Sequence, residues 1–327
     1  MLNLFRQNIF AQYAILLVVT LLMWASSFMN PVGMVSIDFN SPLSMVLYLW
    51  LKKEPLTATI LAYLLMLGGG YMLNTILYNR RLIGQNTILP MFAYCILMSC
   101  STETLGLSPI VIVNIFVIIL MQQMMVPDTL HVSFDQIFNS AMVISIASLF
   151  YLPALTMLIS MLLIVIIHSL YHWRHWVMLL LGLAAPYIIV FVVYFMSDSL
   201  TANSFLIRNE LEDVKLFIAP SSFVQYLQQG GLILMILVGL IASISQSRDI
   251  TVNRRNMAIL ATPLVGGLAL LPYNTIFPID FQFLAPSTAV LIGIFFYNAS
   301  PYTARNKKNW AVELLFVMFA LIGFLPC

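Results

Sequence analysis

The sequence predicts an all-α protein, a polytopic transmembrane helical bundle of about eleven spans that forms a single integral-membrane domain over residues 1–327. Three observations lead to this prediction: the composition, the length of the apolar runs, and the placement of the basic residues. Of the 327 residues, 61% are hydrophobic and 8% are charged. A soluble domain carries about 25% charged residues. The few charges of this chain cannot cover a surface in water, so we expect its solvent to be largely lipid.

The apolar runs have lengths near that of a membrane span. A bilayer core of about 30 Å is crossed by about 20 apolar residues in helical conformation. The first run follows Arg6 and has no convincing small-residue cleavage site, so we expect a retained span rather than a signal peptide. In chain order the runs occupy residues 10–28, 57–76, 87–101, 107–125, 137–152, 154–170, 176–197, 230–246, 257–272, 283–298 and 310–326.

A further apolar stretch, residues 41–51, is too short to span the bilayer. Lys52 and Lys53 follow it directly. This pattern predicts a helix that lies in the membrane interface, with the lysine side chains reaching the lipid headgroups. The helix falls within residues 29–56, which together with residues 198–229 form the two longest loops.

The region around Pro153 decides the topology. Residues 137–170 form either one kinked helix or a hairpin, and the positive-inside rule separates the two. With a hairpin and a cytoplasmic N-terminus, ten basic residues lie inside and four outside, out of 14 in the sequence. With a single helix, five lie inside and nine outside. We therefore predict the hairpin, a cytoplasmic N-terminus and a periplasmic C-terminus.

The acidic residues sort in the opposite way. By the same topology eight of the 12 Asp and Glu residues fall on the outer side, which also carries both long loops. Only Glu313 enters a span, about one turn past Trp310, where it can also snorkel toward the interface. Ion-coupled carriers need ionisable groups at membrane depth, so we expect a functional site in the outer loops instead.

Asp38, in the segment SIDFNSP of the first long loop, is the candidate catalytic residue. A carboxylate there is suited to act as a general base on a hydroxyl acceptor. The alternative is a helix cap or Asx-turn that opens the 41–51 helix. In the second long loop Arg208 and Lys215 are candidate ligands for a lipid-linked phosphate, or members of a solvated surface helix with intrahelical ion pairs.

Asn114 is the candidate substrate-binding residue within the spans. Like Gln122 and Gln123, it either lines a cavity or makes hydrogen bonds between helices. The string HSLYHWRHW over residues 168–176 has His spacing that suits a metal ion, but no Cys, Asp or Glu accompanies it. An interfacial belt of aromatic and basic residues explains it better. We therefore predict no metal site and no cofactor.

Several segments resemble an uncharacterised integral-membrane family of Bacteroidota, described only as a domain of unknown function. The resemblance implies a multi-pass protein of the bacterial inner membrane and brings no activity with it. The segments are FNSAMVISIASLFYLPAL (138–155), HWRHWVMLLLGLAAPYIIVF (172–191), LIGQNTILPMFAYCILMSC (82–100) and LGLSPIVIVNIF (105–116).

The arrangement of loops is also similar to that of GT-C membrane glycosyltransferases, which use polyprenyl-phosphate sugar donors. Those enzymes have a catalytic acidic residue and interfacial helices in an outer loop after the first span. Here Asp38 and residues 41–51 occupy that place, although the loop is short and has no paired acidic motif. The likeness implies action on lipid-linked sugars or envelope glycans, with membrane lipid and a polyprenyl-phosphate-linked sugar as partners.

Two other functions fit the sequence. A carrier or flippase for a lipid or small solute would use Asn114 and the glycine-rich helices to line a path, and a non-catalytic partner of an envelope assembly complex would need no reactive residue. A net charge of +2 gives no reason to expect nucleic acid.

Overall fold

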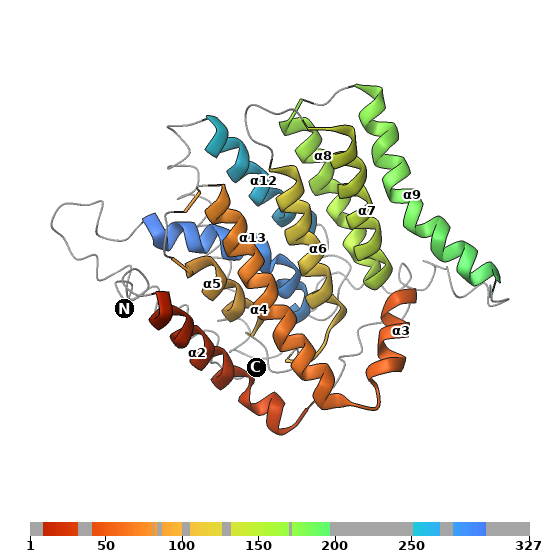
Figure 1. Cartoon of the computed structure of the whole chain (residues 1–327). Coiled ribbons are helices and arrows are strands. Elements are labelled where there is room, and N and C mark those ends of the chain that lie inside the picture. Colours follow the sequence, from red (N-terminus) through yellow and green to blue (C-terminus); the bar gives the residue numbers. More distant parts are fainter. Residues whose placement is uncertain are drawn as a thin grey trace.

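The computed structural model describes residues 9–31, 41–80, 82–83, 87–99, 105–125, 132–169, 172–196, 251–268 and 277–298. This part of the chain is 88% helical and contains no strand, so the all-α class is confirmed for it. Its elements, drawn in Figure 1, are α2 (Ile9–Met29), α3 (Pro42–Leu51), α4 (Pro55–Asn79), α5 (Leu89–Met98), α6 (Pro109–Met124), α7 (Phe134–Phe150), the 3-10 helix η2 (Leu152–Thr156), α8 (Met157–Ile167), α9 (Trp173–Met196), α12 (Thr251–Leu268) and α13 (Phe277–Asn298).

Three of these helices, α2, α4 and α9, are long and apolar enough to cross a membrane. The other apolar helical stretches span 10–17 residues among the residues whose side chains the structure describes. Apart from α3, they coincide with predicted runs. The structure thus agrees with a membrane protein, whereas the number of about eleven spans and the sidedness of the termini stay predictions. The predicted runs 230–246 and 310–326 lie outside the described residues.

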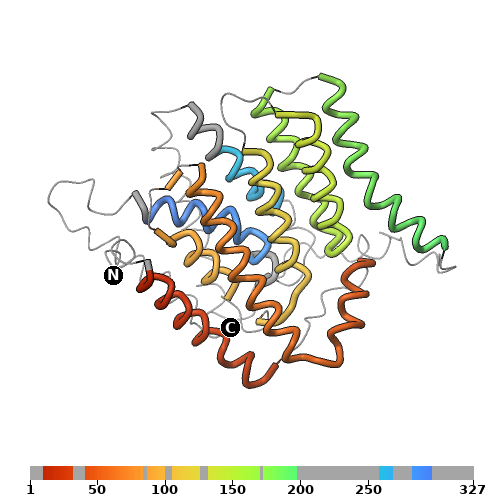
Figure 2. Tube along the Cα trace, in the orientation of Figure 1, coloured from red at the N-terminus to blue at the C-terminus, as the bar shows by residue number. Residues whose placement is uncertain are grey.

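Helix α5 forms the centre of the bundle. All ten of its residues are buried, and it lies within the span predicted over residues 87–101. Helix α13 packs along it in the opposite direction, as Figures 1 and 2 show. A Cβ atom on Gly293 would lie 2.8 Å from the Cα atom of Pro90. At the other end of the pair, Gln282 of α13 lies beside Met98 of α5. The run is buried because other helices surround it.

Helix α9 lies at the edge of the molecule, on the same side as α3 and opposite α2 (Figure 1). It is the least buried of the three long helices. Leu180 is 64% exposed, Ile189 65% and Met196 79%. A continuous apolar surface of this kind is unusual on a soluble monomer. It is typical of a helix that faces lipid.

The chain reverses direction between α7 and α8. The rings of Phe134 and His175 stack with centroids 4.8 Å apart near the start of α7 and α9. The hydroxyl groups of Ser148 and Tyr187 lie 2.7 Å apart further along both helices. Helices α7 and α9 therefore run in the same direction (Figure 2), and the chain returns between them. The turn is at η2, which contains Pro153, so the predicted reversal is present and a single helix over residues 137–170 is wrong.

Candidate functional site

Of the four site residues that the sequence predicts, only Asn114 lies within the described residues. Asp38, Arg208 and Lys215 lie outside them. Two regions of the structure bear on the predicted site. One is the start of α3, which follows the Asp38 segment in sequence, and the other is the surroundings of Asn114 in the core.

The start of α3 is attached to the α7–α8 reversal. Ser41 occupies the N-cap position, Pro42 provides the favoured first residue, and no side chain caps the helix. The Oγ atom of Ser41 instead accepts a hydrogen bond from the backbone N–H of Leu152 at 3.3 Å. Ser41 is buried. This bond joins two segments that are 111 residues apart in sequence, and it fixes the position of the start of α3 against the α7–α8 reversal.

One face of α3 is apolar and exposed. It carries Met45, Val46, Leu49 and Trp50, of which Trp50 is 83% exposed. Ser44, on another face, is buried. The exposed residues belong to a 10-residue helix that is too short to cross a bilayer. The helix predicted over residues 41–51 therefore exists, and a short helix with an exposed apolar face suits the membrane interface.

Two lysines follow this face directly. Lys52 and Lys53 are exposed, and the Nζ atom of Lys52 lies 5.6 Å from the centroid of the Tyr48 ring. A cation over an aromatic face is held by the ring quadrupole. The end of α3 thus combines positive charge with apolar surface, which is the combination that recognises a phosphate headgroup and its acyl chain.

Asn114, near the start of α6, links three helices. Its Nδ2 atom donates to the backbone oxygen of Gln282 in α13 at 2.7 Å and approaches Sδ of Met98 in α5 at 3.2 Å. In turn, Nε2 of Gln282 donates to the backbone oxygen of Met98 at 3.0 Å. Asn114 is fully buried. Hydrogen bonds between helices are therefore part of its role in the core.

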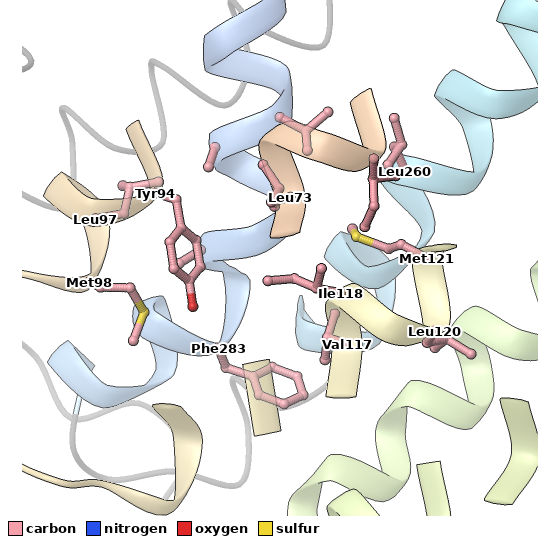
Figure 3. Packing of buried hydrophobic residues seen from close by; sticks show 14 of the residues in the cluster. Leu73, Tyr94, Leu97, Met98, Val117, Ile118, Leu120, Met121, Leu260 and Phe283 are labelled. Atoms are coloured by element: carbon pink, nitrogen blue, oxygen red, sulfur yellow. The ribbon is translucent and has the colours of Figure 1, made fainter. Parts of the chain in front are cut away.

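Tyr94 lies beside this cluster, one turn before Met98 on α5. Figure 3 shows its ring directed from α5 toward Met98 and Phe283. The side chain of Asn114 interacts with the Tyr94 hydroxyl. On the α4 side a Cβ atom on Gly69 would lie 3.0 Å from the hydroxyl oxygen. Glycine at position 69 thus allows the tyrosine to approach the backbone of α4.

Sequence reasoning identified Asn114 but missed Tyr94, Ser99 and Gln282. Ser99 accepts a hydrogen bond from Nε1 of Trp24 in α2 at 3.0 Å, and it donates to the backbone oxygen of Cys95 at 2.7 Å. The available signal was the presence of polar side chains inside apolar runs. That signal does not say which helix each side chain faces.

The histidines of the 168–176 segment are used in packing. Nε2 of His168 lies 3.1 Å from the backbone oxygen of Met124. The ring of His175 is buried against Phe134, with the His172 ring 5.8 Å away. Within the described ranges, no three His, Cys, Asp or Glu side chains gather closely enough to hold a metal ion.

Comparison of the chain with protein-family models, with curated proteins and with solved structures found no match. Its function is therefore inferred from its own residues and geometry.

Proposed function

We propose that this chain is a multi-pass protein of the bacterial inner membrane that acts at the outer leaflet on lipid-linked sugars or envelope glycans, in the manner of a GT-C glycosyltransferase. The N-terminus is cytoplasmic and the C-terminus periplasmic. The apolar lengths of α2, α4 and α9 and the exposed apolar surface of α9 support the membrane assignment. The excess of acidic residues on the outer side supports the choice of leaflet.

The proposed reaction transfers a sugar from a polyprenyl phosphate to a hydroxyl group. Asp38 accepts the proton of the acceptor hydroxyl as its oxygen attacks the anomeric carbon. The bond from that carbon to the phosphate oxygen breaks, and polyprenyl phosphate leaves. Arg208 and Lys215 bind the phosphate and stabilise the negative charge that it gains.

The observation that carries this proposal is the exposed apolar face of α3, anchored through Ser41 to Leu152. Asp38 precedes Ser41 by three residues in sequence. An interfacial helix at that position gives a lipid-linked substrate a surface on which its chain and phosphate lie next to the carboxylate. Lys52 and Lys53 add positive charge at the far end of the same helix.

The test is Asp38→Asn in the native host, scored by profiles of envelope glycans and lipid-linked sugars. We expect a lipid-linked sugar to accumulate and one glycan product to be lost. Glu54→Gln is the matched control, because Glu54 is another acidic residue of the same predicted loop in the sequence. Its side chain is exposed and makes no capping bond. A normal profile in Asp38→Asn, with wild-type protein levels, would rule out the transferase.

A carrier or flippase is the second candidate, and the observation that favours it is the polar cluster of Asn114 in the core. A carrier needs hydrogen-bonding groups inside the bundle, where its solute passes. For this function we expect Asn114→Leu to reduce transport of a labelled lipid in proteoliposomes. Asp38→Asn would transport normally, so the pair of variants separates the two functions.

A further inference from the structure

Lys52 and Lys53 belong to the turn that joins α3 to α4, at the edge of the molecule (Figure 1). The ten residues of α3 separate this turn from Ser41 by about 15 Å, because each helical residue adds about 1.5 Å. Asp38 precedes the Ser41 end in sequence. The two lysines are therefore a feature separate from the residues assigned to the proposed reaction.

Apolar and basic side chains share one face near this turn. Met45, Leu49 and Lys52 follow one another at spacings of four and three residues, which places them on the same side of a helix. Lys52 itself keeps the helical backbone conformation. All three side chains are exposed. An acyl chain that lies along Met45 and Leu49 therefore brings its headgroup to Lys52.

The ammonium group of Lys52 is held close to the helix. Its Nζ atom lies 5.6 Å from the centroid of the Tyr48 ring, and the Lys52 backbone N–H donates to the backbone oxygen of Tyr48 at 2.9 Å. An ammonium group has three N–H donors and no acceptor. A phosphate oxygen accepts from these donors while the ring covers the other side of the cation.

The charges of the turn favour a headgroup with net negative charge. Lys53 is exposed next to Lys52, and the acidic side chain that follows, Glu54, is exposed as well. Two positive charges and one negative charge leave the turn with a net charge of +1. A zwitterionic headgroup brings its own ammonium group beside its phosphate, whereas an anionic headgroup brings negative charge alone. The turn is therefore complementary to the anionic headgroup.

Trp50 indicates the depth at which this turn lies. Its side chain is exposed two residues before Lys52, and indole rings favour the level of the lipid headgroups. Lysine side chains at the same level reach the phosphate groups of neighbouring lipids. The apolar face and the positive charge of α3 are thus both placed to contact one lipid molecule.

We propose that the end of α3 binds one anionic phospholipid of the bilayer, with its phosphate at Lys52 and Lys53 and an acyl chain along Met45 and Leu49. This inference is independent of the transferase reaction. It uses none of the residues assigned to that reaction, so either proposal can fail while the other stands.

The test is quenching of Trp50 fluorescence by brominated lipids in vesicles that contain the full chain. Phosphatidylcholine is replaced stepwise by brominated phosphatidylglycerol or, in parallel, by brominated phosphatidylcholine. The chain has five tryptophans, so the Trp50 signal is taken as wild type minus Trp50→Phe. Each lysine near an anionic lipid adds about fivefold in affinity. We expect phosphatidylglycerol to bind at Trp50 at least about fivefold more tightly than phosphatidylcholine.

The double variant Lys52→Gln, Lys53→Gln should lose this preference. Both side chains are exposed, so the variant should fold. The matched control is Arg80→Gln with Arg81→Gln, which removes an adjacent basic pair at the opposite end of α4 and should keep the preference. An unchanged preference in the lysine variant would overturn the proposal, as would an equal loss in the arginine variant.

Two measurements on the wild type alone complete the test. The preference for phosphatidylglycerol should fall as salt is raised, because exposed charges are screened, and a preference that salt does not reduce would contradict the lysine site. A trace of polyprenyl phosphate should leave the quenching by excess brominated phosphatidylglycerol unchanged. Relief of quenching would assign this surface to the lipid-linked substrate instead of a bilayer phospholipid.

Discussion

Gln282 holds α13 against α5 by donating a hydrogen bond from Nε2 to the backbone oxygen of Met98, 3.0 Å away and 184 residues distant in sequence. Asn114 of α6 donates to the backbone oxygen of Gln282 itself. Three helices thus meet through two amide side chains and two backbone carbonyls, those of Met98 and Gln282. Because α5 is buried along its whole length, this junction lies away from solvent and lipid, and its bonds face no competition from water.

Removal of the Asn114 amide should weaken this junction. We expect Asn114→Leu to lower stability by about 1–2 kcal/mol, since bonds of this kind contribute about 0.6 kcal/mol and at most about 1.7 kcal/mol each, and the Gln282 carbonyl loses its donor. Thermal unfolding in detergent measures the effect. The control is Asn74→Leu, because Asn74 is half-buried on α4. Equal stability of both variants would contradict the role given to Asn114.

The contact between Gly293 and Pro90 should also be sensitive to substitution. A Cβ atom at position 293 would lie 2.9 Å from the backbone nitrogen of Pro90, so α13 and α5 must move apart to accept it. We expect Gly293→Ala to destabilise the protein by about 1–3 kcal/mol through overpacking. Gly68→Ala is the control, since a Cβ atom there meets nothing within 4 Å, and it should be neutral or stabilising because alanine favours helix.

Ser41→Ala should release the start of α3 from the α7–α8 reversal. The variant removes the acceptor of the Leu152 N–H group, so we expect faster hydrogen exchange at that amide and in the first turn of α3. The loss in stability should be about 0.5–1.5 kcal/mol. Thr57→Ala removes a hydroxyl that bonds only the nearby Glu54 carbonyl. Thr57→Ala is the control, and hydrogen exchange at the Leu152 amide in this variant should match that of the wild type. Unchanged exchange at the same amide in Ser41→Ala would contradict the role of Ser41 in holding α3 to the reversal.

A charge in the middle of α9 should oppose its insertion. Leu181 is 53% exposed and lies near the centre of the helix, where an aspartate costs about 3 kcal/mol in lipid. We expect Leu181→Asp to reduce the membrane-integrated fraction of the protein, measured by carbonate extraction. Trp173→Asp, at the first residue of α9, should insert normally because its charge can reach the interface. Normal insertion of Leu181→Asp would mean that lipid does not cover this surface.

The proposed topology predicts from which side of the membrane a cysteine in each loop can be labelled. In a background without accessible native cysteines, Lys53→Cys should react with an impermeant maleimide added to spheroplasts. Arg174→Cys should react only after the membrane is opened. Labelling of both positions from the outside would refute the α7–α8 reversal as a membrane hairpin and the assignment of the outer loops.

Local sequence was sufficient to predict the helices. The short helix at residues 41–51 followed from a short apolar stretch with two lysines directly after it, and α3 occupies Pro42–Leu51. The reversal at Pro153 followed from the placement of basic residues in loops on both sides of it, and η2 forms there. The first signal is local composition, and the second is the distribution of basic residues along the whole sequence; neither depends on which helices pack together.

Burial and partners were decided by tertiary packing. Residues 87–101 have the composition of a lipid-facing span, yet α5 is short and enclosed by other helices. Nothing in the string around Asn114 indicates that it bonds a carbonyl 168 residues away. An apolar residue is equally stable against lipid and against another helix, so hydropathy cannot separate the two.

The sequence by itself indicated a helical protein that belongs in a membrane. A chain with 8% charged residues cannot cover its surface in water, and apolar runs of about 20 residues satisfy their backbone in lipid as helices. Only the tertiary structure decided which polar groups meet in the core. Tyr94, Asn114 and Gln282 come from three different helices, and their contact depends on the close approach of α4, α5, α6 and α13. That approach is set by the shapes of the helix surfaces, with Gly69 and Gly293 among the closest points.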